Sequence, residues 1–297
     1  MSIKEYPPQQ HIPVLLNDVT DLLAPQKAES YLDLTAGYGG HASVILEASG
    51  NYKGSVLVDR DEYAISQLQP LSDKGVQLMH QDFLSAATAL ANEKRRFDMI
   101  LVDLGVSSPQ LDRAERGFSF SKDGPLDMRM DNRQETTAES IVNEAPIDEL
   151  TRIIHEYGEE PYQKARRIAE AVTAGRPLKT TSELAEVIAN QHRGKRERIH
   201  PATRTFQAIR IAVNNELGQI ETLLPLIPRL LNQGGRVAII SFHSLEDRLI
   251  KRFFKEQSES GFEAELDILT KKAIAGSIND VHNPRSRSTK LRGAVKK

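Results

Sequence analysis

Short apolar runs and helical repeats alternate along the first hundred or so residues of the chain. Apolar runs of strand length occur at 30–35, 54–58, 76–79 and 97–102, and the fourth is closed by Asp103. Four segments have apolar residues at helical spacing. The first begins near Pro13, and the others span 41–48, 61–68 and 84–91. Strands that alternate with helices in units of about thirty residues predict a parallel sheet with right-handed crossovers.

This alternation stops after the fourth predicted strand and returns late in the chain. Residues 105–135 show little periodicity, and 136–191 carry only helical patterns, clearest at 147–155, 162–172 and 182–189. Helices over 202–216 and 220–231 then precede a strand over 236–240, a helix over 245–255 and a short strand over 266–269. We therefore predict a doubly wound α/β domain, residues 1–112 and 215–297, with an inserted all-helical subdomain, residues 113–214.

Composition limits the class of protein. The formal net charge is -2, so any affinity for nucleic acid must come from local basic segments. There are no cysteines, which excludes disulfides and thiolate metal sites. The first ten residues lack an apolar signal-peptide core, and no apolar run reaches membrane-spanning length. The default expectation is a cytoplasmic enzyme or binding protein without a required metal.

A glycine-rich loop joins the first predicted strand to its helix. It contains Gly37, Gly39 and Gly40, followed by His41. Glycines let the backbone turn sharply and approach a ligand without a Cβ in the way, and the helix N-terminus favours polar or anionic groups. A simple strand-to-helix turn would also explain the glycines.

Acidic residues follow the other predicted strands. Asp59 ends the second strand, about twenty residues after Gly39, where an acid can bind a ribose diol. Asp82 and Phe83 follow the third strand, where a base could be bonded and stacked, and Asp103 ends the fourth. Each acid alone could be a helix N-cap. Together they predict a ligand site at the carboxyl edge of the sheet.

Two nucleotide cofactors compete for this predicted site. A dinucleotide loop follows G-x-G-x-x-G, and here Ala42 takes the third glycine position, which tolerates alanine. The loop therefore does not exclude NAD. The Asp82–Phe83 pair and Asp103 favour S-adenosylmethionine.

Several longer motifs carry a resemblance to a known family. The chain resembles the bacterial 16S rRNA cytosine-N4 methyltransferases, the RsmH or MraW family. The matching stretches are 11–16, 37–41, 102–112, 115–120, 123–130, 200–210, 241–248 and 283–288.

The resemblance implies a Rossmann-like class I methyltransferase domain whose helical insertion recognises the substrate. It implies methyl transfer from S-adenosylmethionine to N4 of one cytidine in the P-site region of the decoding centre. It also implies a set of cofactor contacts: Gly39, Gly40, His41, Asp59, Phe83, Asp103 and Gln110.

The group that assists transfer stays open at this point. Many amino-methyltransferases carry an Asp/Asn/Ser-Pro-Pro-aromatic motif after the fourth strand, and residues 103–109 lack it. Asp103, a backbone carbonyl within 104–108 and His243 are the candidates for the hydrogen-bond acceptor on N4. For His243 the structural interpretation, a histidine that bonds a loop, is favoured over a catalytic one.

Two basic segments are candidate RNA contacts, although such runs are usually solvated faces. The candidate residues are Arg193, Lys195, Arg196, Arg198 and Arg204 in the first segment and Arg285 and Arg287 in the C-terminal one. The expected partner is 16S rRNA in the small ribosomal subunit, and a homodimer is a further possibility. The rival functions are an NAD-dependent oxidoreductase and an RNA-binding ribosome-assembly factor without turnover.

Overall fold

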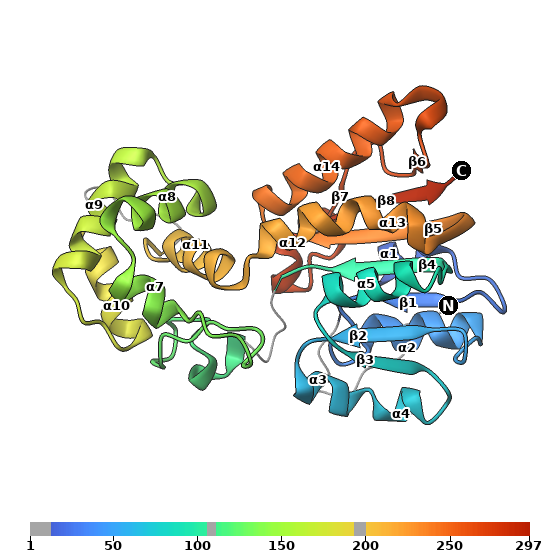
Figure 1. The fold of residues 1–297 in the computed structure, drawn as a ribbon, viewed down its shortest axis with the longest axis horizontal. Coiled ribbons are helices and arrows are strands. Elements are labelled where there is room, and N and C mark those ends of the chain that lie inside the picture. Colours follow the sequence, from blue (N-terminus) through green and yellow to red (C-terminus); the bar gives the residue numbers. More distant parts are fainter. Residues whose placement is uncertain (1–12, 106–110, 193–199) are drawn as a thin grey trace. The chain divides into compact units, whose positions relative to one another are not determined.

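The computed structural model describes residues 13–105, 111–192 and 200–297 of the chain. It divides into two compact units (Figure 1). The first contains Met1–Gly105 and Gly218–Lys297, and the second contains Val106–Leu217. The borders between these units lie within several residues of the domain borders expected from the sequence.

An eight-stranded sheet forms the centre of the first unit, in the order β3-β2-β1-β4-β5-β8-β6, with β7 pairing with β8. The strands are β1 (Tyr31–Asp33), β2 (Val56–Asp59), β3 (Gln77–His80), β4 (Phe97–Asp103), β5 (Leu231–Ser241), β6 (Leu266–Ile268), β7 (Ile274–Ala275) and β8 (Lys290–Lys296). The neighbouring strands β3, β2, β1, β4 and β5 are parallel, whereas β8 is antiparallel to β5. The strand order reverses between β1 and β4, and open α/β sheets bind ligands at such a switch point. The doubly wound fold expected from the sequence is confirmed.

Side chains on the strands alternate between two apolar layers. On β4, Ile100 and Val102 face a core shared with α5, α12, α13 and α14. Met99 and Leu101 face the opposite core, shared with α1, α2 and the α3–α4 segment. The bounds of these helices are α1 (Leu16–Leu23), α2 (Gly40–Ser49), α3 (Glu62–Gln67), α4 (Gln69–Ser72), α5 (Phe83–Asn92), α12 (Glu216–Leu223), α13 (Ile227–Leu230) and α14 (Ser244–Glu259). Burial of both sheet faces explains why β1, β2 and β4 read as continuous apolar runs.

The basic C-terminal run is part of the fold, and its role as an RNA contact stays a prediction. Its last residues form β8, and Lys290 and Arg292 bind Asp247 in the first turn of α14 at 2.9 Å and 2.7 Å. The preceding residues form a 3-10 turn, Pro284–Ser288, and α15 covers Gly276–Asn279. These elements were not predicted because they are short and their apolar positions are sparse.

The second unit is helical, with α7 (Ala138–Glu144), α8 (Ile147–Gly158), α9 (Tyr162–Ala174), α10 (Thr181–Ala189) and α11 (Thr203–Asn214). These helices share one apolar core, in which α8 packs against α9 and α11. The described part of the segment before α7 is held by backbone contacts. A Cβ on Gly124 would lie 1.9 Å from the carbonyl oxygen of Ala114, and the Asn214 side chain hydrogen-bonds the backbone of Met128 and Met130.

Within these described residues, no helix is both long and apolar enough to cross a membrane.

Candidate functional site

The glycine loop is shaped by packing as well as by its turn. Gly37 and Gly39 have φ angles of +53° and +76°, in the left-handed region that favours glycine. A Cβ on Gly39 would lie 2.9 Å from Leu68 Cδ2, and one on Gly40 would lie 2.4 Å from Pro13 Cγ. The space that a Cβ would take at these two glycines is therefore filled by protein, and their contact with the cofactor stays a prediction. Only Gly37 of this loop has open space where a Cβ would lie.

Asp59, at the end of β2, holds this loop. Its carboxylate accepts hydrogen bonds from the backbone N–H groups of Gly37 and Asp61, both at 2.8 Å. Burial raises the pKa of Asp59 despite these two bonds. Because each carboxylate oxygen can accept more than one hydrogen bond, the contact with a ribose diol stays a prediction.

A second buried carboxyl, Asp33, ends β1 and was not singled out from the sequence. The hydroxyl of Tyr31 donates to it at 2.7 Å and the N–H of Thr35 at 3.1 Å. Burial raises the pKa of Asp33 to about 7. Because the apolar run extends to residue 35, the sequence places Asp33 inside the first strand, whereas the strand of the structure ends at this residue.

Asp103 ends β4 beside Asp33. Its N–H donates to Thr35 Oγ1 at 2.6 Å, so the ends of β1 and β4 are joined through one threonine. Oδ2 lies 4.0 Å from Nε2 of the buried His41, and Oδ1 accepts no hydrogen bond from the described residues. Burial, reinforced by the charges of Asp33 and Glu246, holds the pKa of Asp103 well above its usual range.

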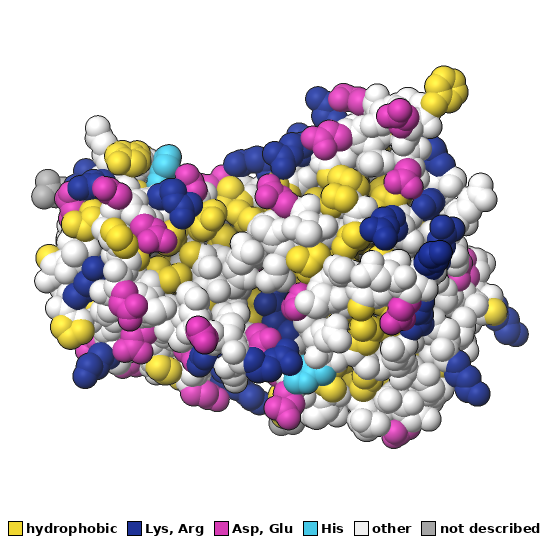
Figure 2. Space-filling view, viewed as in Figure 1, with side chains coloured by type: hydrophobic (Ala, Val, Ile, Leu, Met, Phe, Trp, Pro, Cys, Tyr) yellow, Lys and Arg dark blue, Asp and Glu magenta, His cyan; other side chains and the backbone are white. Residues whose placement is uncertain are grey.

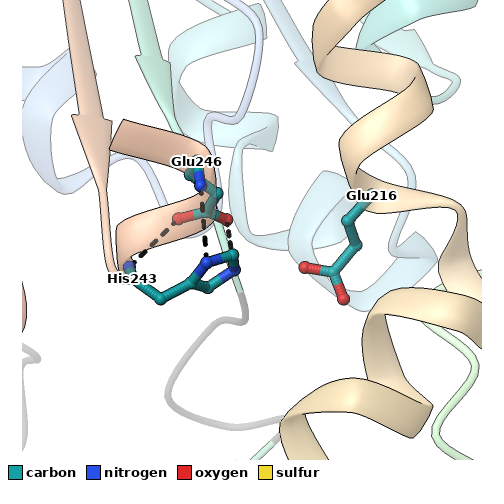
Figure 3. A group of neighbouring side chains, drawn as sticks. All are labelled: Glu216, His243 and Glu246. Carbon is teal, nitrogen blue, oxygen red and sulfur yellow. Dashed lines mark hydrogen bonds and ion pairs between the residues drawn. The ribbon is translucent and has the colours of Figure 1, made fainter. Parts of the chain in front are cut away.

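His243, by contrast, is a helix cap (Figure 3). It is the N-cap residue of α14, and its Nδ1 accepts the N–H of Glu246 at 3.4 Å. Since Nδ1 accepts, the ring proton belongs on Nε2, which lies 3.3 Å from Glu246 Oε1. The Glu246 carboxylate in turn accepts the N–H of Phe242 at 2.7 Å. It also accepts the N–H of His243 at 3.4 Å, so the two side chains form a reciprocal capping box at the start of α14.

The acid–aromatic pair after β3 also belongs to a helix start. Asp82 caps α5, accepting the N–H of Ser85 at 2.9 Å and its hydroxyl at 2.6 Å. Phe83 is the first residue of α5, is only 6% exposed, and has the Arg60 guanidinium 5.9 Å from its ring centre. The stacking of a base on Phe83 stays a prediction. Most of the Phe83 ring is covered by the core.

The remaining candidates are divided between the described residues and those outside them. Gln110, Arg193, Lys195, Arg196 and Arg198 lie outside the described residues. Arg204, in the second unit, has an exposed side chain whose guanidinium lies 3.7 Å from the buried carboxylate of Glu160. Arg287 is exposed and Arg285 is partly buried.

The charge at this edge distinguishes between the two nucleotide cofactors. Asp33, Asp59, Asp103 and Glu246 interact electrostatically, and burial or like charge raises the pKa of the three aspartates. A dianionic pyrophosphate would increase this repulsion, whereas the sulfonium and ammonium groups of S-adenosylmethionine would relieve it. A doubly wound sheet with this acidic edge is the arrangement of an S-adenosylmethionine-dependent methyltransferase.

Comparison with known proteins identifies the family. The MraW methylase family model matches residues 8–297, and the chain belongs to this family. A protein named ribosomal RNA small subunit methyltransferase H from Acidobacterium capsulatum is 46% identical over 97% of this chain and 99% of its own length. A protein of the same name from Cyanothece sp. is 47% identical over 95% of this chain and 93% of its own length. The resemblance drawn from the motifs is confirmed, and the NAD-dependent oxidoreductase is ruled out.

Among solved structures, an rRNA methylase from Streptococcus thermophilus is 10% identical to this chain, with a TM-score of 0.41. The match covers 95% of this chain and 93% of that chain.

Proposed function

We propose that this chain methylates N4 of one cytidine in the P-site region of 16S rRNA, within the small ribosomal subunit of the bacterial cytoplasm. The observation that carries the proposal is the family match along nearly the whole chain, together with relatives named for methylation of small-subunit rRNA. The motifs quoted above support the N4 position. In this proposal residues 1–112 and 215–297 bind the cofactor, and residues 113–214 recognise the RNA.

The residues at the carboxyl edge fit the proposed cofactor. When bound, S-adenosylmethionine supplies a methyl group made electrophilic by its positively charged sulfonium. Asp103 Oδ1, which accepts no hydrogen bond from the described residues, would accept one from the cofactor or from the target amine. Asp59 would bind the ribose, and Gly39, Gly40, His41, Phe83 and Gln110 complete the proposed set.

The raised pKa of Asp103 gives this carboxyl a role that depends on charge. Burial and the charges of Asp33 and Glu246 raise the pKa of Asp103 and so favour its protonated form. Positive charge on a bound ligand reverses this preference and leaves an ionised acceptor. That acceptor can draw the N4 lone pair out of conjugation and take the amine proton as the new bond forms. The cytosine must leave its stack to reach such a pocket.

Labelled methyl transfer to small-subunit particles tests the proposal. We expect label in 16S rRNA and N4-methylcytidine when the RNA is digested to nucleosides and analysed by mass spectrometry. Label in a different nucleoside would overturn the N4 assignment. Tight RNA binding without any transfer would instead support the assembly factor without turnover.

A further inference from the structure

The sheet of the first unit has a basic depression at the edge opposite the proposed catalytic site. This depression, of about 560 Å³, is lined by Ala91, Lys94, Arg96, Arg229, Glu265 and Lys296. Lys94 and Arg96 lie between α5 and β4, Arg229 lies on α13, and Lys296 ends β8. These elements meet where β4 and β5 begin, and Figure 2 shows Lys and Arg side chains gathered beside this end of the sheet.

The cations of the basic depression are mostly without acidic partners. Lys296 donates to the carbonyl of Pro228 and lies 3.5 Å from the Glu265 carboxylate. Among the described residues, no carboxylate pairs with Lys94, Arg96 or Arg229, and all three are exposed. By contrast, the neighbouring Arg95 is used by the fold, since it donates to Gln77 and lies over Phe97.

Folding alone does not explain this grouping. A cation near a helix C-terminus gains roughly 0.3–1 kcal/mol from the helix dipole, which suits Lys94 after α5 and Arg229 at the end of α13. The helix dipole does not explain the position of Arg96. It also does not explain why four cations surround one depression that has a single carboxylate. Like charges held together in this way repel each other unless an anion lies between them.

We propose that the basic depression binds phosphate groups of the RNA backbone, as a second contact away from the reacting base. This inference rests on the proposed function, because it takes rRNA as the partner. The depression is open and its cations are exposed, which suits a phosphate carried by a large partner better than an enclosed small anion. Strand β4 has seven residues, so Asp103 and the depression are about 20 Å apart along the sheet, a span that a folded RNA can bridge.

The test replaces Lys94, Arg96 and Arg229 together with Gln and measures binding to small-subunit rRNA at several salt concentrations. We expect the affinity at 0.1 M salt to fall between about tenfold and hundredfold, and the salt slope to decrease by about 2, from three lost phosphate contacts. Lys296 is left in place because it bonds the protein backbone. The matched control replaces Lys251, Arg252 and Lys255 on the exposed side of α14, which removes the same charge elsewhere.

Three further measurements separate the outcomes. Affinity for S-adenosylmethionine and the melting temperature should match the unsubstituted protein, and methyl transfer should show a higher KM for RNA with unchanged kcat. RNA affinity and salt slope equal to those of the unsubstituted protein, or an equal loss in the α14 control, would overturn the proposal. Tight binding of inorganic phosphate that the triple variant abolishes would also overturn it, in favour of a small-anion site. Failure of the proposed function appears differently, as an absence of methyl transfer by the unsubstituted protein.

Discussion

Replacing Asp33 with Asn should remove a large part of the pH dependence of the free energy of unfolding between pH 5 and pH 8. In the folded chain the pKa of Asp33 is about 7, against an ordinary value of 3.8. The unfolded chain therefore releases the Asp33 proton at lower pH than the folded chain does. Stability is lost as pH rises from about 4, and the loss levels off above about pH 7.

The magnitude follows from the size of the pKa shift. A difference of about three units corresponds to about 4 kcal/mol in total, of which about 2 to 3 kcal/mol falls between pH 5 and pH 8. Asn keeps the shape of the side chain and its carbonyl can still accept the N–H of Thr35, while its amide can donate to the Tyr31 hydroxyl. The variant should thus gain stability relative to the unsubstituted protein as the pH rises.

Urea unfolding at several pH values measures this difference directly. Asp98→Asn is the control of opposite sign, because hydrogen bonds from Ser30 and Asn232 help to lower the pKa of Asp98 below its usual value. Its contribution to stability is present at neutral pH and is lost as the pH falls through the folded pKa. If the free energies of unfolding of Asp33→Asn and of the unsubstituted protein changed in parallel with pH, the raised pKa of Asp33 would be refuted.

Three further predictions concern the same unit. Asp103→Asn should lower the single-turnover rate at saturating S-adenosylmethionine far more than it weakens cofactor binding; a rate near that of the unsubstituted enzyme would exclude Asp103 as the acceptor. Gly39→Ala should destabilise by about 1–3 kcal/mol more than Gly37→Ala in urea unfolding, since both have positive φ but only Gly39 has Leu68 against the new Cβ. Asp247→Asn should cost about 3 kcal/mol in the same assay, because it leaves the buried Arg292 without its carboxylate; a loss below about 1 kcal/mol would contradict this.

The sequence predicted the parallel part of the fold because its signals are local. A buried strand such as β4 is a continuous apolar run, and a helix such as α8 shows a 3.6-residue repeat. The C-terminal strand β8 has neither signal. It is held by its pairing with β5 and by the contact of Arg292 with Asp247, both of which join residues far apart in the chain.

The sequence could bring the candidate residues to one edge of the sheet, since the carboxyl ends of parallel strands meet there. The contacts between these residues could not be predicted. The hydrogen bond from the Asp103 N–H to Thr35 depends on the register of β1 against β4, which no local pattern encodes. The glycines show the same limit, because the loop motif is visible in the sequence while the Leu68 side chain that makes Gly39 necessary is not.

The hydrogen-bond partners distinguish between polar residues that all follow a strand and that the sequence alone could not tell apart. Asp82 and His243 each follow a strand, and each side chain caps the first turn of a helix. Asp59 holds the glycine loop through two backbone N–H groups. In Asp103, one buried carboxylate oxygen accepts no hydrogen bond from the described residues. Such an atom is costly in a folded protein unless a ligand completes it, which supports the proposal that Asp103 binds the cofactor or the target amine.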